Sequence, residues 1–148
     1  MSKNVFIFWH EVGGVSALGG VQVRLVPNDE RGMIDPLAME QAIRPAGNIH
    51  FPRTSLLCLE NTHNRCNGGV LTPMDLKSLA DVAHAHQMFV HLDGARIFNA
   101  AVSLEVPAKE LVEDVDDVSF CLSKGLSAPA GSMVCGTAEF VQRARKWR

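Results

Sequence analysis

The chain has 148 residues, of which 47% are hydrophobic and 20% are charged, and its formal net charge at pH 7 is −2. This length and apolar content suit one globular domain, or a large part of one, with a buried core. The near-neutral charge, with basic residues clustered only at the very end of the chain, excludes the strongly cationic surface of a nucleic-acid-binding protein. We therefore expect small molecules or protein subunits as partners, and no nucleic acid.

No apolar run approaches the roughly 18 residues that a membrane-spanning helix needs, and the N-terminal segment does not resemble a secretory signal. The cysteines form neither a CxxC pair nor a compact disulfide framework, so we interpret them as reduced thiols. These features predict a cytoplasmic protein without a membrane partner, although they leave open an upstream targeting segment. The cysteines are Cys58, Cys66, Cys121 and Cys135.

Strand-like and helix-like segments alternate along the first part of the chain. Residues 21–27, VQVRLVP, are typical of a strand. Asp35 followed by Pro36 predicts a capped helix start, and the helix should run through Ile43 and end before a proline. Residues 55–60, SLLCLE, are apolar nearly throughout, which is typical of a strand covered on both faces.

The alternation continues in the second part. Thr72, Pro73 and Asp75 predict a second capped helix, with an apolar stripe at helical spacing that extends to about His86. Three further strands are expected at 88–92, 118–122 and 132–136, followed by a helix from Thr137 that still continues at Trp147.

This order predicts an α/β fold, with a three-layer α/β/α architecture around a mostly parallel sheet. No repeat, low-complexity tract or linker divides residues 1–148, so we expect a single domain. The chain starts directly in an apolar segment and stops within a helix pattern. We therefore expect this domain to be incomplete at both ends.

Polar clusters follow three of the predicted strands. They are ENTHNR at 60–65, DGAR at 93–96 and SKG at 123–125. Ligands of open α/β sheets bind beyond the carboxyl ends of the strands, where side chains lie exposed between helix N-termini. If these strands are neighbours, seven side chains should converge on one cleft: Glu60, His63, Arg65, Asp93, Arg96, Ser123 and Lys124.

Each of these residues alone has an ordinary structural interpretation. A carboxylate before glycine, as at Asp93, is more often a turn or a helix cap than a ligand. A single loop histidine such as His63 is usually a hydrogen-bonded structural group, and a lysine before glycine such as Lys124 is usually solvated. Their joint placement at three strand ends favours function over these separate interpretations.

The combination of lysine, aspartate and arginine suits pyridoxal phosphate. A lysine amine binds this cofactor covalently, and a carboxylate keeps its pyridine nitrogen protonated so that the ring withdraws electrons. The forked guanidinium of an arginine matches a substrate carboxylate. We expect Asp93 to face the ring nitrogen and Arg96 to face an amino-acid substrate.

The segments ENTHNRCNGG, HLDGARIFNAA and SFCLSKGLSAPAGS, preceded by RPAGNIHFPRTSLLCLENTHN, resemble the low-specificity L-threonine aldolases. These are pyridoxal-phosphate enzymes of the aspartate-aminotransferase-like fold, fold type I. The similarity extends over nearly the whole chain. It implies the large, cofactor-binding domain of that fold, and for the whole family a homo-oligomer, a tetramer, built around sites at subunit interfaces.

The resemblance also implies roles for individual residues. Lys124 corresponds to the lysine that carries the cofactor, Asp93 to the aspartate on the pyridine nitrogen, and Arg96 to an arginine that binds the substrate carboxylate. His63 matches a histidine near the substrate β-hydroxyl, where it, or a water that it orients, would act as the base. The implied reaction is the retro-aldol cleavage of L-threonine or L-allo-threonine to glycine and acetaldehyde.

The chain departs from the family at several places. A family histidine that stacks on the cofactor ring aligns with Phe6, five residues before Glu11 of HEVGG, and His10 stands at the family's tyrosine position. A phenyl ring can stack on the cofactor but cannot transfer a proton. The resemblance further implies that the phosphate-binding element precedes residue 1 and that a C-terminal small domain, with a second carboxylate-binding arginine, follows residue 148.

Three alternatives remain open at the sequence level. The chain could be a non-catalytic fragment that binds another subunit, or it could belong to another fold type I amino-acid lyase with the same lysine and aspartate. A metal site built from His84, His86 and His91 is the third alternative. It is disfavoured because the first two lie about 200° apart on a helix and cannot share a face.

Overall fold

The computed structural model describes residues 1–147, and a four-stranded sheet stands at its centre. Strands β1 (Leu56–Glu60), β2 (Phe89–Asp93) and β3 (Asp117–Cys121) are parallel neighbours, and β4 (Ser132–Gly136) pairs antiparallel with β3. The sheet order is therefore the chain order, β1-β2-β3-β4. The predicted α/β class is confirmed, with three parallel strands and one antiparallel strand at the edge.

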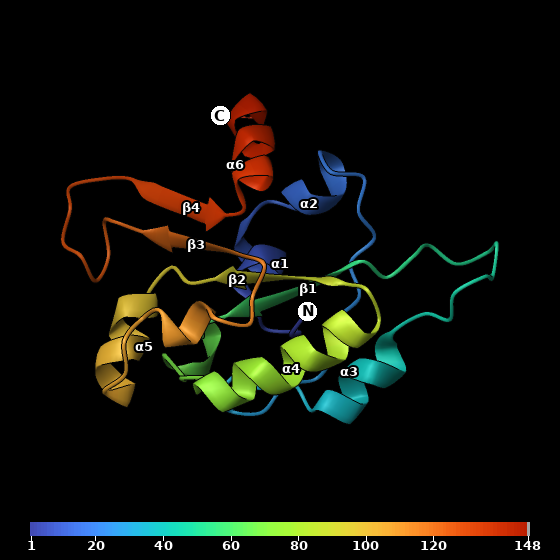
Figure 1. Cartoon of the computed structure of the whole chain (residues 1–148), viewed down its shortest axis with the longest axis horizontal. Helices are drawn as coiled ribbons and strands as arrows, with labels where there is room; N and C mark the ends of the chain where they lie inside the picture. Colours follow the sequence, from blue (N-terminus) through green and yellow to red (C-terminus); the bar gives the residue numbers. More distant parts are fainter. Residues whose placement is uncertain (148) are drawn as a thin grey trace.

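Helices lie on both sides of this sheet (Figure 1). Helices α3, α4 and α5 lie below the strands in that view, while α2 and α6 lie above them. The α-helices are α1 (Phe6–His10), α2 (Gly14–Ala17), α3 (Pro36–Ala42), α4 (Pro73–Ala85), α5 (Ile97–Leu104) and α6 (Ala138–Ala144). Short 3-10 helices, η1 (Asn64–Cys66), η2 (Glu110–Val112) and η3 (Arg145–Trp147), supplement them.

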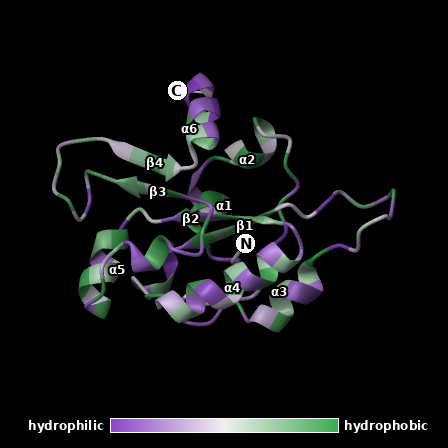
Figure 2. Cartoon of the chain, in the orientation of Figure 1, coloured by the Kyte–Doolittle hydropathy of each residue, from purple (hydrophilic) through white to green (hydrophobic). Residues whose placement is uncertain are grey.

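The hydrophobic core lies between the sheet and α4. Alternate strand residues, among them Leu57 and Leu59 of β1 and Val90 and Leu92 of β2, join the buried stripe of α4 in one cluster. In Figure 2 the strands carry green positions beside paler or purple ones, and green and purple positions are mixed along α4. Because side chains alternate along a strand, the intervening positions face away from α4. Those positions include the last residues of β1 and β2.

The predicted helix starts are confirmed. The side chain of Asp35 accepts a hydrogen bond from the backbone N–H of Ala38, with Pro36 in the first turn of α3. At α4, the hydroxyl of Thr72 accepts from the N–H of Asp75, and the Asp75 carboxylate accepts from the N–H of Thr72. This reciprocal capping box satisfies backbone donors that the first turn of a helix leaves unpaired.

The strand predicted at 21–27 is wrong. Of its residues only Val26 forms a β-bridge, an isolated parallel one with Ser2, and Val21 and Leu25 are exposed. Alternating hydrophobicity indicates a strand only where a neighbouring backbone is available to pair with it, and here the segment meets just the first residues of the chain. Helix α5 was not predicted from the sequence. The last predicted helix is α-helical only to Ala144 and continues to Trp147 as the 3-10 helix η3.

The remaining sequence hypotheses concern cysteines, metals and membranes. All four cysteines are free thiols. His84, His86 and His91 lie against three different carboxylates, those of Asp116, Glu40 and Asp117, and residues 1–147 hold no cluster of three metal-ligating side chains, so the structure does not support the metal alternative. Within the same residues, no helix is long and apolar enough to cross a bilayer.

The capping box makes a testable prediction. Thr72→Ala should lower the free energy of unfolding by about 1 kcal/mol, because the hydroxyl that caps α4 is lost. Urea denaturation at neutral pH measures this loss. Thr72→Ser keeps the hydroxyl and should retain most of the stability, so an equal loss in both variants would contradict the capping explanation.

Candidate functional site

The ends of β1 and β2 bring two carboxylates together. Glu60 and Asp93 are register partners in the parallel pair, and Asp93 is in turn the partner of Ser119 in β3. Strand alternation places both carboxylates on the face of the sheet that points away from α4. This is the carboxyl edge of the sheet, where open α/β folds bind their ligands.

Asp93 begins the turn that leads into α5. Its Oδ1 accepts a hydrogen bond of 3.0 Å from the N–H of Ala95, and the N–H of Gly94 donates to the carbonyl of Ser119. Within residues 1–147, the second carboxylate oxygen of Asp93 has no hydrogen-bond partner. Oδ1 therefore fixes the side chain, and Oδ2 can accept a hydrogen bond from a ligand.

Arg96 links two of the three polar clusters predicted from sequence. It precedes the first residue of α5, and its Nη1 donates a hydrogen bond of 3.1 Å to the side-chain carbonyl of Asn64. Asn64 belongs to η1, directly after the end of β1. This amide contact was not predicted, although ENTHNR contains the residue.

Lys124 lies in the loop between β3 and β4, and its exposed ammonium stands 5.8 Å from the centroid of the Phe6 ring. A cation at that distance over an aromatic face is electrostatically favourable. Gly125 allows the loop to approach α5, since a Cβ there would lie 2.3 Å from Oδ1 of Asn99. The predicted cofactor lysine and the residue at the ring-stacking position therefore come together.

Glu60 is a buried carboxylate with two backbone donors. Its Oε2 accepts from the N–H of Phe6 and its Oε1 from the N–H of Asn64, both at 2.7 Å. Burial is the largest influence on its pKa and raises it, with a further upward contribution from Asp93. The two N–H donors and the charge of Arg96 oppose that rise.

His63 is completely buried beneath this edge. Its Nε2 lies 3.2 Å from the hydroxyl of Ser2 and 3.9 Å from Oε2 of Glu60, while its Nδ1 has no partner within the described residues. Gly32 packs directly on the imidazole, where a Cβ would lie 2.2 Å from Cδ2. Burial lowers the pKa of His63 and outweighs the opposite influence of Asp29 and Asp93, which favours the neutral ring.

Two members of the predicted cluster turn elsewhere. The guanidinium carbon of Arg65 stands 4.5 Å over the ring of Trp9. Ser123 is exposed, and its side chain makes no hydrogen bond within residues 1–147. The structure thus associates Lys124 with Phe6 and Arg96 with Asn64. Glu60 accepts hydrogen bonds from the backbone N–H groups of Phe6 and Asn64.

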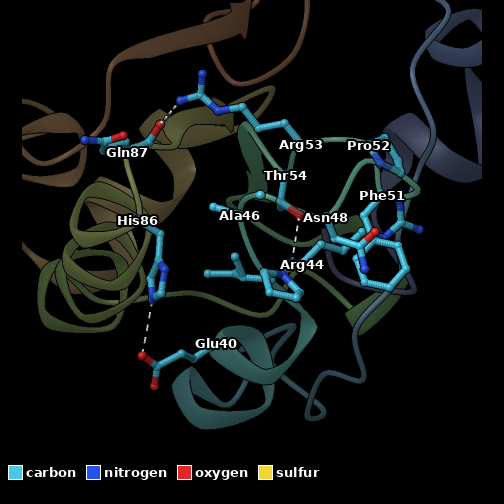
Figure 3. Close-up of a pocket in the computed structure, with 13 residues that line it drawn as sticks. Glu40, Arg44, Ala46, Asn48, Phe51, Pro52, Arg53, Thr54, His86 and Gln87 are labelled. Atoms are coloured by element: carbon cyan, nitrogen blue, oxygen red, sulfur yellow. Dashed lines mark hydrogen bonds and ion pairs between the residues drawn. The ribbon is translucent and has the colours of Figure 1, made fainter.

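Two cavities lie away from Lys124 and Asp93. One of about 490 Å³ is bounded by the end of α3, the end of α4 and the loop that precedes β1 (Figure 3). There His86 faces Glu40, and Arg53 reaches the carbonyl of Gln87. Neither this cavity nor a second of similar volume is lined by Lys124 or Asp93.

The buried imidazole predicts how stability depends on pH. Because the folded-state pKa of His63 is lowered, its stabilising contribution is complete above its ordinary value of 6.5 and decreases as pH falls below it, where the unfolded chain binds the proton first. Urea unfolding measured between neutral and mildly acidic pH should show this loss. His63→Gln should flatten the dependence, and equal slopes in the two proteins would contradict the prediction.

Known proteins resemble the chain along its entire length. The beta-eliminating lyase family model matches residues 1–148. Low-specificity L-threonine aldolase 1 of Arabidopsis thaliana is 42% identical over 149 aligned residues, which cover 100% of this chain and 42% of the relative. The low specificity L-threonine aldolase of Escherichia coli K12 is 41% identical over 140 residues, which cover 93% of this chain and 40% of the relative.

Solved structures share the fold. The threonine aldolase of Leishmania major superimposes with a TM-score of 0.74 at 21% identity, over 90% of this chain and 38% of that one. The structure of Oryza sativa TDC with PLP gives a TM-score of 0.61 at 23% identity, over 80% of this chain and 25% of the other. These matches confirm the fold predicted from the resemblance, and the curated relatives confirm the similarity to the threonine aldolases. The chain belongs to the beta-eliminating lyase family.

Proposed function

We propose that this chain is the cofactor-binding part of a pyridoxal-phosphate-dependent lyase that cleaves L-threonine and L-allo-threonine to glycine and acetaldehyde. Its curated relatives carry the name low-specificity L-threonine aldolase at 41–42% identity. The observation that carries the proposal is the carboxyl edge of the sheet, where Lys124 meets the Phe6 ring and Asp93 keeps one carboxylate oxygen unengaged by residues 1–147.

The residues present fit pyridoxal phosphate. Lys124 offers an exposed amine, Asp93 offers a carboxylate oxygen for a protonated ring nitrogen, and Phe6 offers a flat apolar face for stacking. When bound, the cofactor supplies an electron-withdrawing ring that stabilises the charge developing at the α-carbon of an amino acid. We propose that Lys124 holds it covalently and that Asp93 keeps its ring nitrogen cationic.

Arg96 is proposed to bind the substrate carboxylate. A guanidinium has five N–H donors in a planar fork, and the hydrogen bond to Asn64 uses one nitrogen while leaving donors for a carboxylate. The turn after Asp93 places Arg96 only three residues beyond that carboxylate. This spacing suits a small amino acid held between the cofactor and the guanidinium.

His63 is proposed as the group that takes the proton of the β-hydroxyl, directly or through a water. Its burial keeps the imidazole neutral and therefore able to accept a proton, and Nδ1 has no partner among the described residues. Phe6 can cover one face of the ring but cannot exchange protons. Any proton transfer must therefore fall to other groups, and the complete burial of His63 favours transfer through a water over direct contact.

The chain spans 42% and 40% of the two curated relatives compared above. We propose that residues 1–148 are one part of a large domain whose complete enzyme also contains a phosphate-binding element and a small domain. We further propose a cytoplasmic homo-oligomer. Half-exposed apolar side chains near the antiparallel edge, Leu126, Met133 and Val134, support a covering by other parts of such an assembly.

Covalent labelling tests the cofactor proposal. Incubation with pyridoxal phosphate, followed by borohydride reduction, should add one pyridoxyl phosphate to the peptide that contains Lys124, as measured by mass spectrometry. Lys124→Ala should abolish this labelling, whereas Lys109→Ala should leave it unchanged. Equal labelling of several lysines would indicate only random reaction and would contradict the proposal.

Asp93 provides the test of the chemistry. Asp93→Asn should lower the rate of acetaldehyde release from L-threonine about 100-fold, because an amide does not keep the ring nitrogen protonated. A coupled alcohol dehydrogenase assay measures that rate, with the exposed Asp81→Asn as the matched control. Equal rates of acetaldehyde release in wild type and Asp93→Asn would contradict the role proposed for Asp93.

A further inference from the structure

Glu60 has no assigned role in the proposed reaction, yet it is among the most buried charged groups of the chain, with 4% of its surface exposed. Its two carboxylate oxygens accept backbone hydrogen bonds from different segments. Oε2 bonds to the N–H of Phe6 in α1, and Oε1 bonds to the N–H of Asn64 in η1. The Glu60 side chain thus joins η1 to α1, and Phe6 lies 54 residues before Glu60 in the sequence.

Each of these bonds leads directly to one half of the candidate site. Phe6 carries the ring that lies 5.8 Å from the ammonium of Lys124. Asn64 carries the side-chain carbonyl that accepts from Arg96 at 3.1 Å. Glu60 is therefore connected to Lys124 through one intervening residue, Phe6, and to Arg96 through one intervening residue, Asn64.

We propose that Glu60 is a positioning residue that fixes the Phe6 ring and the Arg96 guanidinium relative to each other. This inference rests on the proposed function, since it assigns the ring to the cofactor and the guanidinium to the substrate carboxylate. A substrate amino acid held beside a cofactor at Lys124 would reach Arg96 only if the two halves of the site keep a set separation. Glu60 maintains that separation through two bonds to backbone, which do not depend on the rotamers of its partners.

A carboxylate suits this place better than any other side chain. It presents two acceptor oxygens and no donor, and both of its partners here are N–H donors. Glutamine would turn an NH₂ group toward one N–H, and aspartate is one methylene too short to reach both. The charged groups around it are Asp93 and Arg96. Nε2 of His63, whose pKa is lowered by burial, lies 3.9 Å from Oε2 of Glu60.

A nearby aromatic contact reports on the same junction. Arg65 of η1 stacks over Trp9 of α1, with 4.5 Å between the guanidinium carbon and the ring centroid, and the indole N–H of Trp9 donates to the carbonyl of Lys3. The contact therefore joins the two segments that Glu60 holds. The emission of Trp9 should change when η1 moves away from α1.

The experiment is a double-mutant cycle on the emission of Trp9, in a Trp147→Phe background that removes the chain's other indole. Arg65→Gln should change Trp9 emission when Glu60 is present, and this effect should be lost when Glu60→Gln is added. Asp35→Asn, which alters another carboxylate that caps backbone, should leave the effect of Arg65→Gln intact. Far-ultraviolet circular dichroism checks that every variant is folded.

A second measurement concerns the site itself. In chain incubated with pyridoxal phosphate and not reduced, glycine should perturb the visible spectrum of the bound cofactor at about tenfold higher concentration in Glu60→Gln than in wild type, the weakening expected from one lost hydrogen bond. Should Glu60→Gln fail to fold, Glu60→Asp replaces it, and we expect the same two losses because aspartate cannot reach both N–H groups.

The outcomes separate this inference from the proposed function. If Arg65→Gln changes Trp9 emission equally with and without the Glu60 substitution, and glycine affinity is unchanged, Glu60 is not a positioning residue. If the Trp9 cycle shows coupling but no label forms at Lys124, Glu60 still holds α1 and η1 together and the proposed function fails. If both fail, the junction carries neither role.

Discussion

The parallel register of β1 and β2 is the constraint on which the candidate site depends. It pairs Glu60 with Asp93, so two carboxylates end neighbouring strands on the same face. The register is itself fixed by the core, because a slip of β1 by one residue would turn Leu57 and Leu59 away from α4, and a slip of β2 would do the same to Val90 and Leu92. The burial of apolar side chains on one face thus dictates which polar side chains meet on the other.

Two carboxylates so close together repel each other, and here they differ in burial and in hydrogen bonding. Glu60 is buried and bonded through both oxygens, whereas Asp93 is half-buried and anchored through one. The first is therefore committed to structure and the second remains available to a ligand. The difference arises from the segments that cover them, since α1 and η1 close over Glu60 while Asp93 opens into the turn before α5.

Local patterns predicted the elements that carry this arrangement. Apolar runs located the four strands of the sheet within a residue or so, and proline with a capping residue located the starts of α3 and α4. The segment 21–27 has the same alternation but no strand beside it, which a single sequence does not reveal. Likewise, the contact of Lys124 with Phe6 depends on how the N-terminal segment folds back over the sheet, and only the family resemblance indicated it.

The burial of Glu60 could not be predicted from the sequence, for a physical reason. At the end of an apolar strand, a glutamate followed by asparagine and threonine has the pattern of a solvated loop, and burying a carboxylate is unfavourable unless donors compensate for lost hydration. Here the donors are backbone N–H groups, which every residue but proline carries and which leave no trace in the sequence. A carboxylate bonded in this way through both oxygens has a defined geometry on both sides. Its substitution should therefore disturb the relation between the two halves of the site more than the stability of either half, because Glu60 lies outside the hydrophobic cluster that packs against α4.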